Sequence, residues 1–256
     1  MSLALFSLAG RTALITGSAR GLGLAMARGL AEAGAAVILN GTSVDGTNAA
    51  CEKLAEEGHK VHALAFDVTD DAAVLAAFGS LDTDGIQVDI LINNAGIQFR
   101  KPMVDLDPAD WRRVVETNLT SAFLIGREAA RRMIARGSGG KIINIASLTS
   151  EVARATVAPY TAAKGGIKLL TRSMAAEWAE YGIQANAIGP GYMATDMNQA
   201  LMSDPKFDAW VKGRTPARRW GLPEELVGAA VFLASPASNY VNGQVIYVDG
   251  GMLAVL

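Results

Sequence analysis

The chain has few of the residues that build disulfides, metal centres or membrane helices. Its single cysteine, Cys51, cannot form an internal disulfide, and we interpret its only histidines, His59 and His62, as surface imidazoles rather than metal ligands. The longest apolar runs, such as residues 229–234, are far shorter than the roughly 20 residues of a membrane helix. The first residues also lack the pattern of a signal peptide. We therefore expect a cytoplasmic protein with no metal site and no membrane partner.

The chain also lacks a large excess of positive or negative charge. The 23 Lys and Arg residues and the 25 Asp and Glu residues give a formal net charge of -2, and the cations are not clustered in the sequence. A nucleic-acid partner is therefore not expected, because phosphate backbones attract clustered cations. Half of the residues are apolar, which suffices for one large core. We expect a single domain over residues 1–256.

What the chain does have is an alternation of short apolar runs with longer segments of helical period. The apolar runs predict strands at Thr12–Thr16, Ala36–Asn40, Val61–Asp67, Ile90–Asn93, Lys141–Ala146, Gln184–Ile188 and Gln244–Val248. The helical periods predict helices at Gly21–Ala33, Val44–Glu57, Ala72–Leu81, Pro108–Ala135, Val157–Tyr181, Thr195–Lys212 and Pro223–Ala234. This pattern is typical of an α/β protein with a parallel sheet covered on both faces. The irregular stretch that begins at Gly189 makes residues 189–219 the predicted substrate lid.

A glycine-rich segment, Thr16–Gly23, follows the first predicted strand and opens the first predicted helix. Its glycines, Gly17, Gly21 and Gly23, would let a pyrophosphate approach backbone N–H groups and the positive end of the helix. Glycine triplets also occur by chance in surface turns. The strand before the segment and the helix after it favour a dinucleotide site.

The end of the second predicted strand bears on the choice between NAD and NADP. NAD sites place an acid about 20 residues after the loop to bind the ribose 2′-hydroxyl, but no carboxylate follows Asn40 before Asp45. Arg20, within the loop, could face a 2′-phosphate. We therefore expect NADP, while a hydrogen bond from Asn40 to a free hydroxyl would still allow NAD. Asp67 is placed to accept from the adenine amino group, or alternatively to cap the next helix.

Three polar residues at the predicted carboxyl edge of the sheet could carry out chemistry. Ser147 ends an apolar run, and Tyr160 and Lys164 are four residues apart on one helix face. Tyrosine titrates near 10, so proton transfer near neutral pH needs its pKa lowered by two or three units, which corresponds to roughly 3 to 4 kcal/mol. One ammonium about 5 Å away can supply about 3 kcal/mol of this. This predicts a site that interconverts a hydroxyl and a carbonyl, with Tyr160 moving the proton and Ser147 donating to the oxygen. The alternative is a packed tyrosine beside a solvated lysine.

Together these segments resemble the short-chain dehydrogenase/reductase family. The likeness covers nearly the whole chain and rests on Thr16–Gly23, Asn93–Gly96, Asn118, Ser147, Tyr160, Lys164 and Pro190–Gly191. It implies a Rossmann-type three-layer sandwich with strand order 3-2-1-4-5-6-7, a homotetramer, and a water held by Asn118 in a proton relay with Lys164. The residues expected around the dinucleotide are Gly17, Ser18, Arg20, Gly21, Leu22, Gly23, Asn40, Thr42, Asp67, Val68, Asn94, Ala95, Gly96, Tyr160, Lys164, Pro190, Gly191, Met193 and Thr195.

Within the family, the chain is more similar to the subgroup that interconverts gluconate and 5-ketogluconate. This likeness rests on residues 5–10, 93–98, 214–221 and 248–255. Arg100 is expected to hold the carboxylate of a sugar acid, and Glu151 and Arg154 to bond its hydroxyls, beside Ser147 and Tyr160. Each of these three charges could instead be a solvated loop residue. Members of that subgroup often carry Asp where Gly41 stands, so the cofactor preference could differ here.

These expectations combine into an NADP-dependent oxidoreductase that interconverts a secondary hydroxyl and a ketone in a sugar acid. A reductase of another carbonyl, such as a 3-ketoacyl thioester, would keep the same catalytic residues and differ only in its pocket. The alternative from another class is a protein that senses the dinucleotide without doing chemistry. The intact set of Ser147, Tyr160 and Lys164 argues against that alternative.

Overall fold

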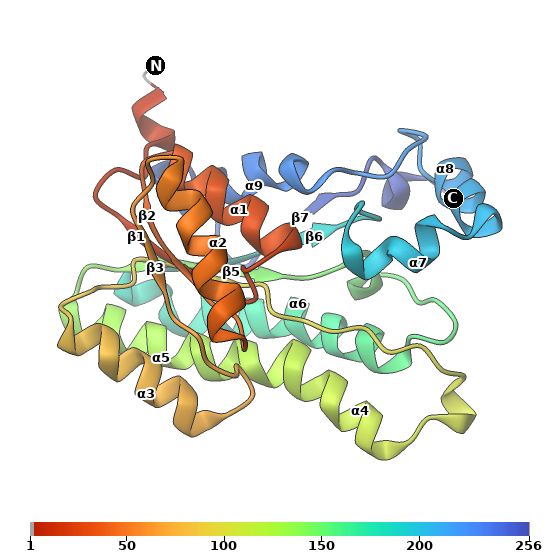
Figure 1. Ribbon diagram of the computed structural model, residues 1–256, viewed down its shortest axis with the longest axis horizontal. Coiled ribbons are helices and arrows are strands. Elements are labelled where there is room, and N and C mark those ends of the chain that lie inside the picture. The colour runs from red at the N-terminus through yellow and green to blue at the C-terminus, as the bar shows by residue number, and fades with distance from the viewer. Residues whose placement is uncertain (1–2, 256) are drawn as a thin grey trace.

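One seven-stranded parallel sheet runs through the centre of the computed structural model, which describes residues 3–255 (Figure 1). The strands are β1 (Thr12–Ile15), β2 (Ala36–Leu39), β3 (Val61–Ala63), β4 (Ile90–Asn93), β5 (Gly140–Ile145), β6 (Ile183–Pro190) and β7 (Val245–Val248). They lie in the order β3-β2-β1-β4-β5-β6-β7, and every neighbouring pair is parallel. The predicted fold class and strand order are confirmed.

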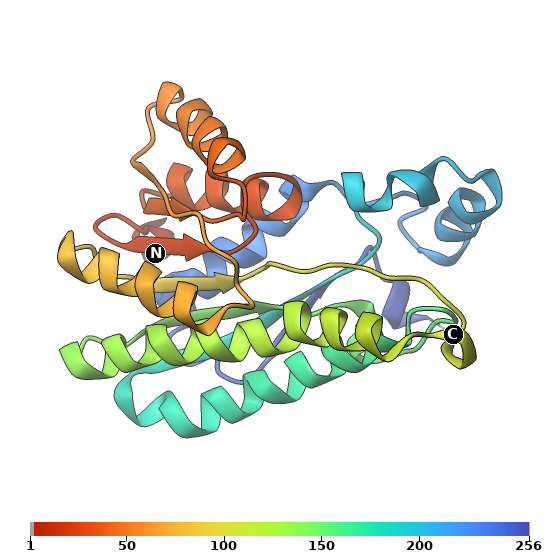
Figure 2. The ribbon, with the colours of Figure 1, turned by 60° about the horizontal axis from the view of Figure 1, so that its bottom comes forward.

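Helices cover both faces of this sheet. The helices of the described residues are α1 (Gly21–Glu32), α2 (Val44–Glu56), α3 (Asp71–Thr83), α4 (Pro108–Val115), α5 (Ser121–Arg136), α6 (Ala158–Trp178), α7 (Gln199–Met202), α8 (Pro205–Arg214) and α9 (Val227–Ala234). Helices α1, α2 and α9 pack on one face, while α3, α5 and α6 pack on the other (Figures 1 and 2). Helices α7 and α8 stand beyond the sheet, on the right of Figure 1. No helix within the described residues has the length and apolar character needed to cross a bilayer.

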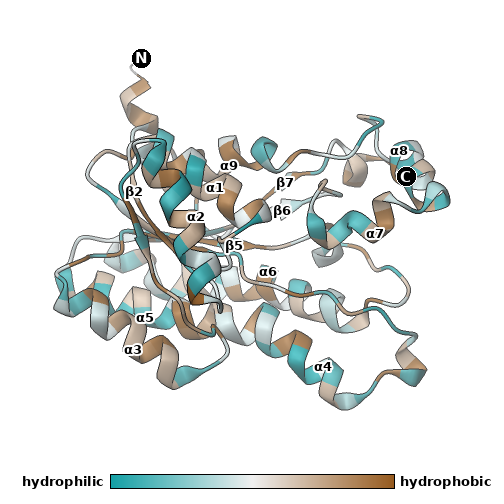
Figure 3. Ribbon diagram, in the orientation of Figure 1, coloured by the Kyte–Doolittle hydropathy of each residue, from teal (hydrophilic) through white to brown (hydrophobic). Residues whose placement is uncertain are grey.

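The strands are apolar because both of their faces are covered. In β1, Ala13 and Ile15 pack against one helical layer and Leu14 packs against the other, and all three are fully buried. A strand exposed on one face would instead alternate apolar and polar residues. Figure 3 shows the resulting brown strands between helices of mixed colour. The apolar runs therefore predicted where the strands lie.

The position of the site follows from a break in the strand order between β1 and β4. The chain moves outward from β1 to β2 and β3, and then returns to place β4 on the other side of β1, where Ala13 pairs with Ile90. The connections after β1 and β4 therefore leave toward opposite faces of the sheet. Such a break leaves a crevice at the carboxyl ends of the strands.

At the edges of the fold, two predicted elements are shorter or more divided than the sequence pattern indicated. The predicted strand Val61–Asp67 ends at Ala63, because its one neighbour, β2, ends opposite that residue. The predicted helix Thr195–Lys212 is divided into a 3-10 turn, α7 and α8. The division occurs where Asp204 caps α8 and Pro205 begins it. Both differences lie at the edges of the fold, where fewer neighbours constrain the chain.

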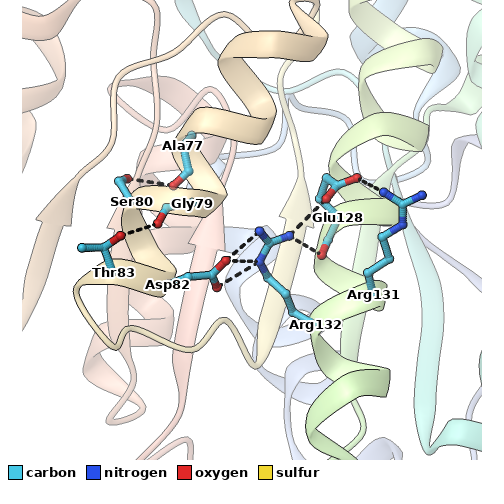
Figure 4. Close-up of polar contacts among 8 residues, drawn as sticks. All are labelled: Ala77, Gly79, Ser80, Asp82, Thr83, Glu128, Arg131 and Arg132. Atoms are coloured by element: carbon cyan, nitrogen blue, oxygen red, sulfur yellow. Dashed lines mark hydrogen bonds and ion pairs between the residues drawn. The ribbon is translucent and has the colours of Figure 1, made fainter.

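An ion-pair network holds α3 against α5 (Figure 4). Glu128, on α5, is buried, and its carboxylate accepts from Arg131 at 2.9 Å and from Arg132 at 3.1 Å. Arg132 also donates to Asp82 on α3 and so links the two helices. A buried carboxylate without partners would be strongly destabilising, and these cations satisfy it. We assign the network to the stability of the fold, because none of its residues lines the cavity described next.

Candidate active site

The crevice between the β1 and β4 connections opens into a cavity of about 900 Å³ at the carboxyl edge of the sheet. Its walls come from the loop between β1 and α1, the ends of β2, β4 and β5, helix α6, and the segment after β6. This volume lies in the upper part of the range for small-molecule sites. All of the predicted site residues line the cavity except Ser18 and Glu151.

The glycine loop forms one end of the cavity and leaves the start of α1 open. Gly17 and Gly21 have φ values of 61° and 58°, in the left-handed region that favours glycine. A side-chain carbon on Gly23 would lie 2.5 Å from the carbonyl oxygen of Gly17, so only glycine lets the loop fold against the helix. Arg20 precedes α1 without a capping side chain, whereas Ser43 caps α2. The open, positive end of α1 therefore fits the pyrophosphate of a dinucleotide.

Two predicted dinucleotide residues instead hold the loop in place. Ser18 is fully buried, and its hydroxyl donates to the Ile15 carbonyl at 2.7 Å and accepts from the Asn40 N–H at 3.0 Å. Because that hydroxyl points into the fold, the prediction that Ser18 contacts the dinucleotide is not supported. Asn40 does line the cavity, but its amide donates to the carbonyls of Leu64 and Phe66. Its amide hydrogens are therefore already used within the fold.

Charged residues stand on both sides of the cavity mouth. The guanidinium of Arg20 lies 3.6 Å from the carboxylate of Asp196, in the segment after β6, and both side chains are largely exposed. An exposed pair of this kind is weak, so Arg20 can exchange its partner for another anion. Asp67 accepts from the N–H and the hydroxyl of Thr69, whereas Asp70 caps α3. The helix-cap alternative for Asp67 is therefore wrong.

Asn118 reaches the cavity because the helix that carries it is irregular. The sequence predicted one helix over Pro108–Ala135, but a π turn at Glu116–Thr120 separates α4 from α5. The buried Asn118 amide donates to the carbonyls of Val114 and Ile97 and accepts from the Ile97 N–H. It thereby fixes the chain just after β4. Turns of this kind are frequent at functional sites, and hydrophobic periodicity does not reveal them.

Ser147, Tyr160 and Lys164 line one wall of the cavity. Ser147 follows β5, while Tyr160 and Lys164 lie one turn apart on α6. The ammonium of the buried Lys164 donates to the carbonyl oxygen of Ile145 at 2.6 Å and lies 5.5 Å from the centre of the Tyr160 ring. The Ser147 hydroxyl hydrogen-bonds to the Tyr160 phenol. The fold therefore brings these three residues and the glycine loop into one cavity.

The electrostatics of the tyrosine differ from the expectation. Desolvation raises the pKa of Tyr160 above its ordinary value, and the hydrogen bond from Ser147 and the charge of Arg100 only partly oppose this rise. Burial also lowers the pKa of Lys164 to about 8. The expectation that Lys164 makes the phenol acidic is therefore wrong for this structure, because the ammonium is itself desolvated and sits over the ring face. A phenol with a raised pKa is protonated at neutral pH, which suits a proton donor.

Two arginines bring positive charge to the same part of the cavity. Arg100 follows β4, and Arg154 lies between β5 and α6. Desolvation and, after it, the nearby charge of Arg154 lower the pKa of Arg100. Arg154 donates to the hydroxyl of Tyr192 at 3.3 Å. Within residues 3–255, neither guanidinium forms an ion pair with a carboxylate.

Glu151 lies outside the cavity. Its carboxylate accepts from the ammonium of Lys168 at 2.7 Å and from the hydroxyl of Tyr247 at 2.7 Å. The hydrogen bonds from Lys168 and Tyr247 lower the pKa of this carboxyl. The prediction that Glu151 bonds substrate hydroxyls is therefore not supported. Its hydrogen bonds instead tie the loop after β5 to α6 and β7.

The cavity is also lined by residues outside the predicted set, and Gln98, Arg113 and Tyr192 are the polar ones among them with the largest side chains. The side-chain amide oxygen of Gln98, Oε1, is buried and has no hydrogen-bond partner among the described residues. Arg113 places its guanidinium 5.4 Å from the centre of the Phe99 ring. Tyr192 directly follows the segment Pro190–Gly191, and Gln98 ends the segment 93–98 that carries the subgroup likeness, so each had a signal in the sequence. Nothing local distinguished Arg113 from other polar residues.

Residues 17–253 match a protein-family model described as Enoyl-(Acyl carrier protein) reductase. A gluconate 5-dehydrogenase of Gluconobacter oxydans is 50% identical over 252 residues, which cover 98% of this chain and 98% of the relative. The chain belongs to the short-chain dehydrogenase/reductase family. As a member of that family it is an oxidoreductase that acts on CH–OH groups.

Two other members of the short-chain dehydrogenase/reductase family bear on the substrate. A 2-dehydro-3-deoxy-D-gluconate 5-dehydrogenase of Formosa agariphila is 46% identical over 258 residues, covering 100% of this chain and 97% of the relative. The crystal structure of a gluconate 5-dehydrogenase from Burkholderia cenocepacia in complex with NADP and tartrate is 49% identical, with a TM-score of 0.97 and 100% of both chains covered. The chain is thus similar along its whole length to dehydrogenases of sugar acids.

Proposed function

We propose that this protein is an NADP-dependent oxidoreductase that interconverts D-gluconate and 5-keto-D-gluconate. The observation that carries the proposal is that Arg100 and Arg154 share one cavity with Ser147, Tyr160 and the glycine loop. A sugar acid needs a cation for its carboxylate and a proton donor at the reacting carbon, and this cavity offers both. The relatives named for gluconate, one of them in complex with NADP, support the same substrate class and cofactor.

We propose that the dinucleotide is held along the cavity between the glycine loop and Lys164. The open end of α1 would bind the pyrophosphate, Arg20 and Thr42 would contact a 2′-phosphate, and Asp67 would contact the adenine. The remaining wall residues proposed to hold it are Leu22, Val68, Asn94, Ala95, Gly96, Pro190, Gly191, Met193 and Thr195. The nicotinamide supplies or accepts the hydride when the dinucleotide is bound.

Ser147 and Tyr160 are the groups that we propose act on the substrate oxygen. During reduction Ser147 donates a hydrogen bond to the carbonyl oxygen, and Tyr160 transfers its proton to that oxygen as the alcohol forms. During oxidation Tyr160 takes the proton back. Its raised pKa keeps it protonated at neutral pH, which favours reduction there. Lys164 and the anchored Asn118 would then return the proton through a water, as the family resemblance implies.

We also propose that residues 189–219 act as a substrate lid. This segment contains α7 and α8, which extend beyond the sheet (Figure 2), and Met193, Thr195 and Leu201 from it line the cavity. Helices α7 and α8 lie after the end of β6 and pair with no strand, so this part of the segment can move without breaking the sheet. The homotetramer that the family resemblance implies and the cytoplasmic location expected from the sequence stay predictions.

Initial rates with NADPH and with NADH against 5-keto-D-gluconate test the proposal. We expect kcat/KM to be at least about tenfold higher with NADPH, because a cation near the 2′-position discriminates by about 1.4 kcal/mol or more. Equal rates would overturn the cofactor assignment. A panel that includes the 5-keto form of 2-dehydro-3-deoxy-D-gluconate and a 3-ketoacyl thioester tests the substrate. The Formosa agariphila relative makes the first of these the second candidate. NADPH binding without turnover of any carbonyl would indicate a sensor.

A further inference from the structure

The segment after β6 carries a small aromatic cluster of its own. Tyr192 lies at its centre, with ring centroids 5.6 Å from Phe207, 5.7 Å from Trp210 and 5.6 Å from Trp220. The Trp220 ring is buried, and its N–H donates to the carboxylate of Asp208 at 2.8 Å. Rings packed edge to face in this way attract one another beyond the area they bury. The segment therefore has the packing to move as one body.

Arg154 attaches this aromatic cluster to the opposite wall of the cavity. Its guanidinium carbon lies 4.6 Å from the centre of the Phe207 ring, and one of its N–H groups donates to the Tyr192 hydroxyl at 3.3 Å. A planar guanidinium can stack on a ring and donate at its edge at the same time, which an ammonium cannot do. Arg154 itself belongs to the loop between β5 and α6, outside the predicted lid.

The same arginine faces a second cation without an anion between them. The charge of Arg154 disfavours the charged form of Arg100, and neither guanidinium has a carboxylate partner in residues 3–255. Their loops are tied together, because the Lys101 N–H donates to the Thr156 carbonyl at 2.9 Å. Thr156 has a φ of 71°, a strained value for a β-branched residue. Strained backbone at a ligand site is maintained only when its surroundings impose it, and here it holds two like charges near each other.

We propose that Arg154 is a specificity-determining residue that couples recognition of the substrate's carboxylate to closure of the lid. The carboxylate bridges Arg100 and Arg154 and removes the repulsion between them. Arg154 then stays docked on Tyr192 and Phe207 and holds the lid over the cavity. A neutral polyol of the same length leaves the two cations in repulsion and does not hold the lid. This inference rests on the proposed sugar-acid substrate.

Tryptophan fluorescence of the NADPH-loaded protein, in which gluconate cannot be oxidised, tests the coupling, because Trp210 and Trp220 lie in the aromatic cluster. We expect D-gluconate to change the emission of the wild type, and D-glucitol, its neutral counterpart, to leave it unchanged at equal concentration. The variant Trp210→Phe should reduce this signal, which assigns it to the lid. An equal response to the two ligands would overturn the coupling.

Variants of Arg154 separate binding of the carboxylate from closure. Arg154→Met should raise KM for gluconate by about tenfold to 100-fold, lower kcat, and abolish the emission change at saturating gluconate. Arg154→Lys keeps the charge, so its KM for gluconate should lie between those of Arg154→Met and the wild type. It should still lack the emission change, because an ammonium cannot stack on Phe207 and donate to Tyr192 at once. Arg100→Met should raise KM while keeping the emission change at saturation. An Arg154→Met variant with the wild-type KM and emission change would overturn the inference.

Two measurements keep the result interpretable. Arg172→Met, an exposed arginine on α6 that does not line the cavity, is the matched control and should behave as the wild type. NADPH binding to each variant reports whether it is folded. Failure of the proposed function looks different from failure of this inference. If the proposed function is wrong, gluconate changes the emission but is not oxidised. If only the inference is wrong, gluconate is oxidised and its KM does not depend on Arg154.

Discussion

Two buried lysines stand at opposite ends of strand β5 and are alike in their electrostatics. Lys141 is the second residue of the strand, and Lys164 reaches its last residue, Ile145, from helix α6. Burial lowers the pKa of each lysine to about 8. Each ammonium donates only to neutral oxygens, and neither forms an ion pair within the part of the chain that the structure describes.

Their surroundings differ. Lys141 is held at the amino end of the strand by the side chains of Ser238 and Asn239, and it does not line the cavity. Lys164 stands at the carboxyl end, over the ring of Tyr160 and in the cavity wall. A lowered lysine pKa therefore indicates that the ammonium is buried, but it does not indicate that the lysine belongs to an active site. The chemistry also needs the open carboxyl edge of a parallel sheet and a second group to act on.

The largest effect on activity should come from removing the hydroxyl of Tyr160, a phenol that lies beside Lys164 and has no counterpart among the hydrogen-bond partners of Lys141. Tyr160→Phe should lower kcat for reduction of 5-keto-D-gluconate by about 10²- to 10⁴-fold, because the ring remains beneath the ammonium but has no proton to give. Steady-state rates measure the loss. NADPH binding, followed by the fluorescence of the bound dinucleotide, should stay within about threefold of the wild type. Near-normal turnover by this variant would remove Tyr160 from the reaction.

Replacing each lysine by methionine tests the comparison directly. Lys164→Met should lower kcat by about 10²-fold or more, because it removes the ammonium that is proposed to return the proton to Tyr160. Lys141→Met should leave kcat within about twofold, because that residue lies at the other edge of the sheet. Steady-state kinetics of the two variants, measured side by side, give the two kcat values. Equal losses would show that the two ends of the strand are coupled, against the distinction drawn here.

The same two variants should affect stability in the same way. Each lysine has a folded pKa of about 8 and an ordinary value of 10.5, so the unfolded chain binds more protons between these values. The free energy of unfolding should therefore rise from about pH 8 to about pH 10.5. Each replacement should remove part of that rise, at most about 3 kcal/mol, and add stability at neutral pH.

Urea unfolding at a series of pH values measures this dependence. Lys60→Met, at an exposed position before β3, is the control and should keep the wild-type slope. A Lys141→Met variant that also keeps the wild-type slope would contradict the buried, titrating state of Lys141.

The smallest effect should come from an exposed cation, Arg20, which contrasts with both buried lysines. Asp196→Asn removes its partner across the cavity mouth. Exposed ion pairs contribute about 1 kcal/mol or less, so KM for NADPH should fall by no more than about fivefold. KM for NADH should not change, because it has no 2′-phosphate for the released guanidinium. Initial rates with both dinucleotides measure the difference. A parallel change in the two KM values would remove Arg20 from 2′-phosphate recognition.

Local patterns predicted most of the candidate site. The glycine loop, the Tyr160–Lys164 spacing and the positions of Ser147 and Asn118 can be read along the chain, and the structure brings all of them to one cavity. The π turn that delivers Asn118 could not be predicted, because an extra residue in one turn leaves no mark on a periodicity averaged over a long helix. Tyr192 meets Arg154 only across the cavity, so no local pattern joins them.

The amino-acid sequence by itself determined the alternation of strands and helices, the open end of α1, and which residues carry protons and charge. Those features depend on neighbours within a few positions, where backbone preference and side-chain spacing act. Only the tertiary structure decided that Ser18 and Glu151 turn away from the cavity and that the pKa of Tyr160 rises. Burial and opposing charge depend on which distant segments pack together, and desolvation of the phenol outweighed the hydrogen bond from Ser147 and the charge of Arg100.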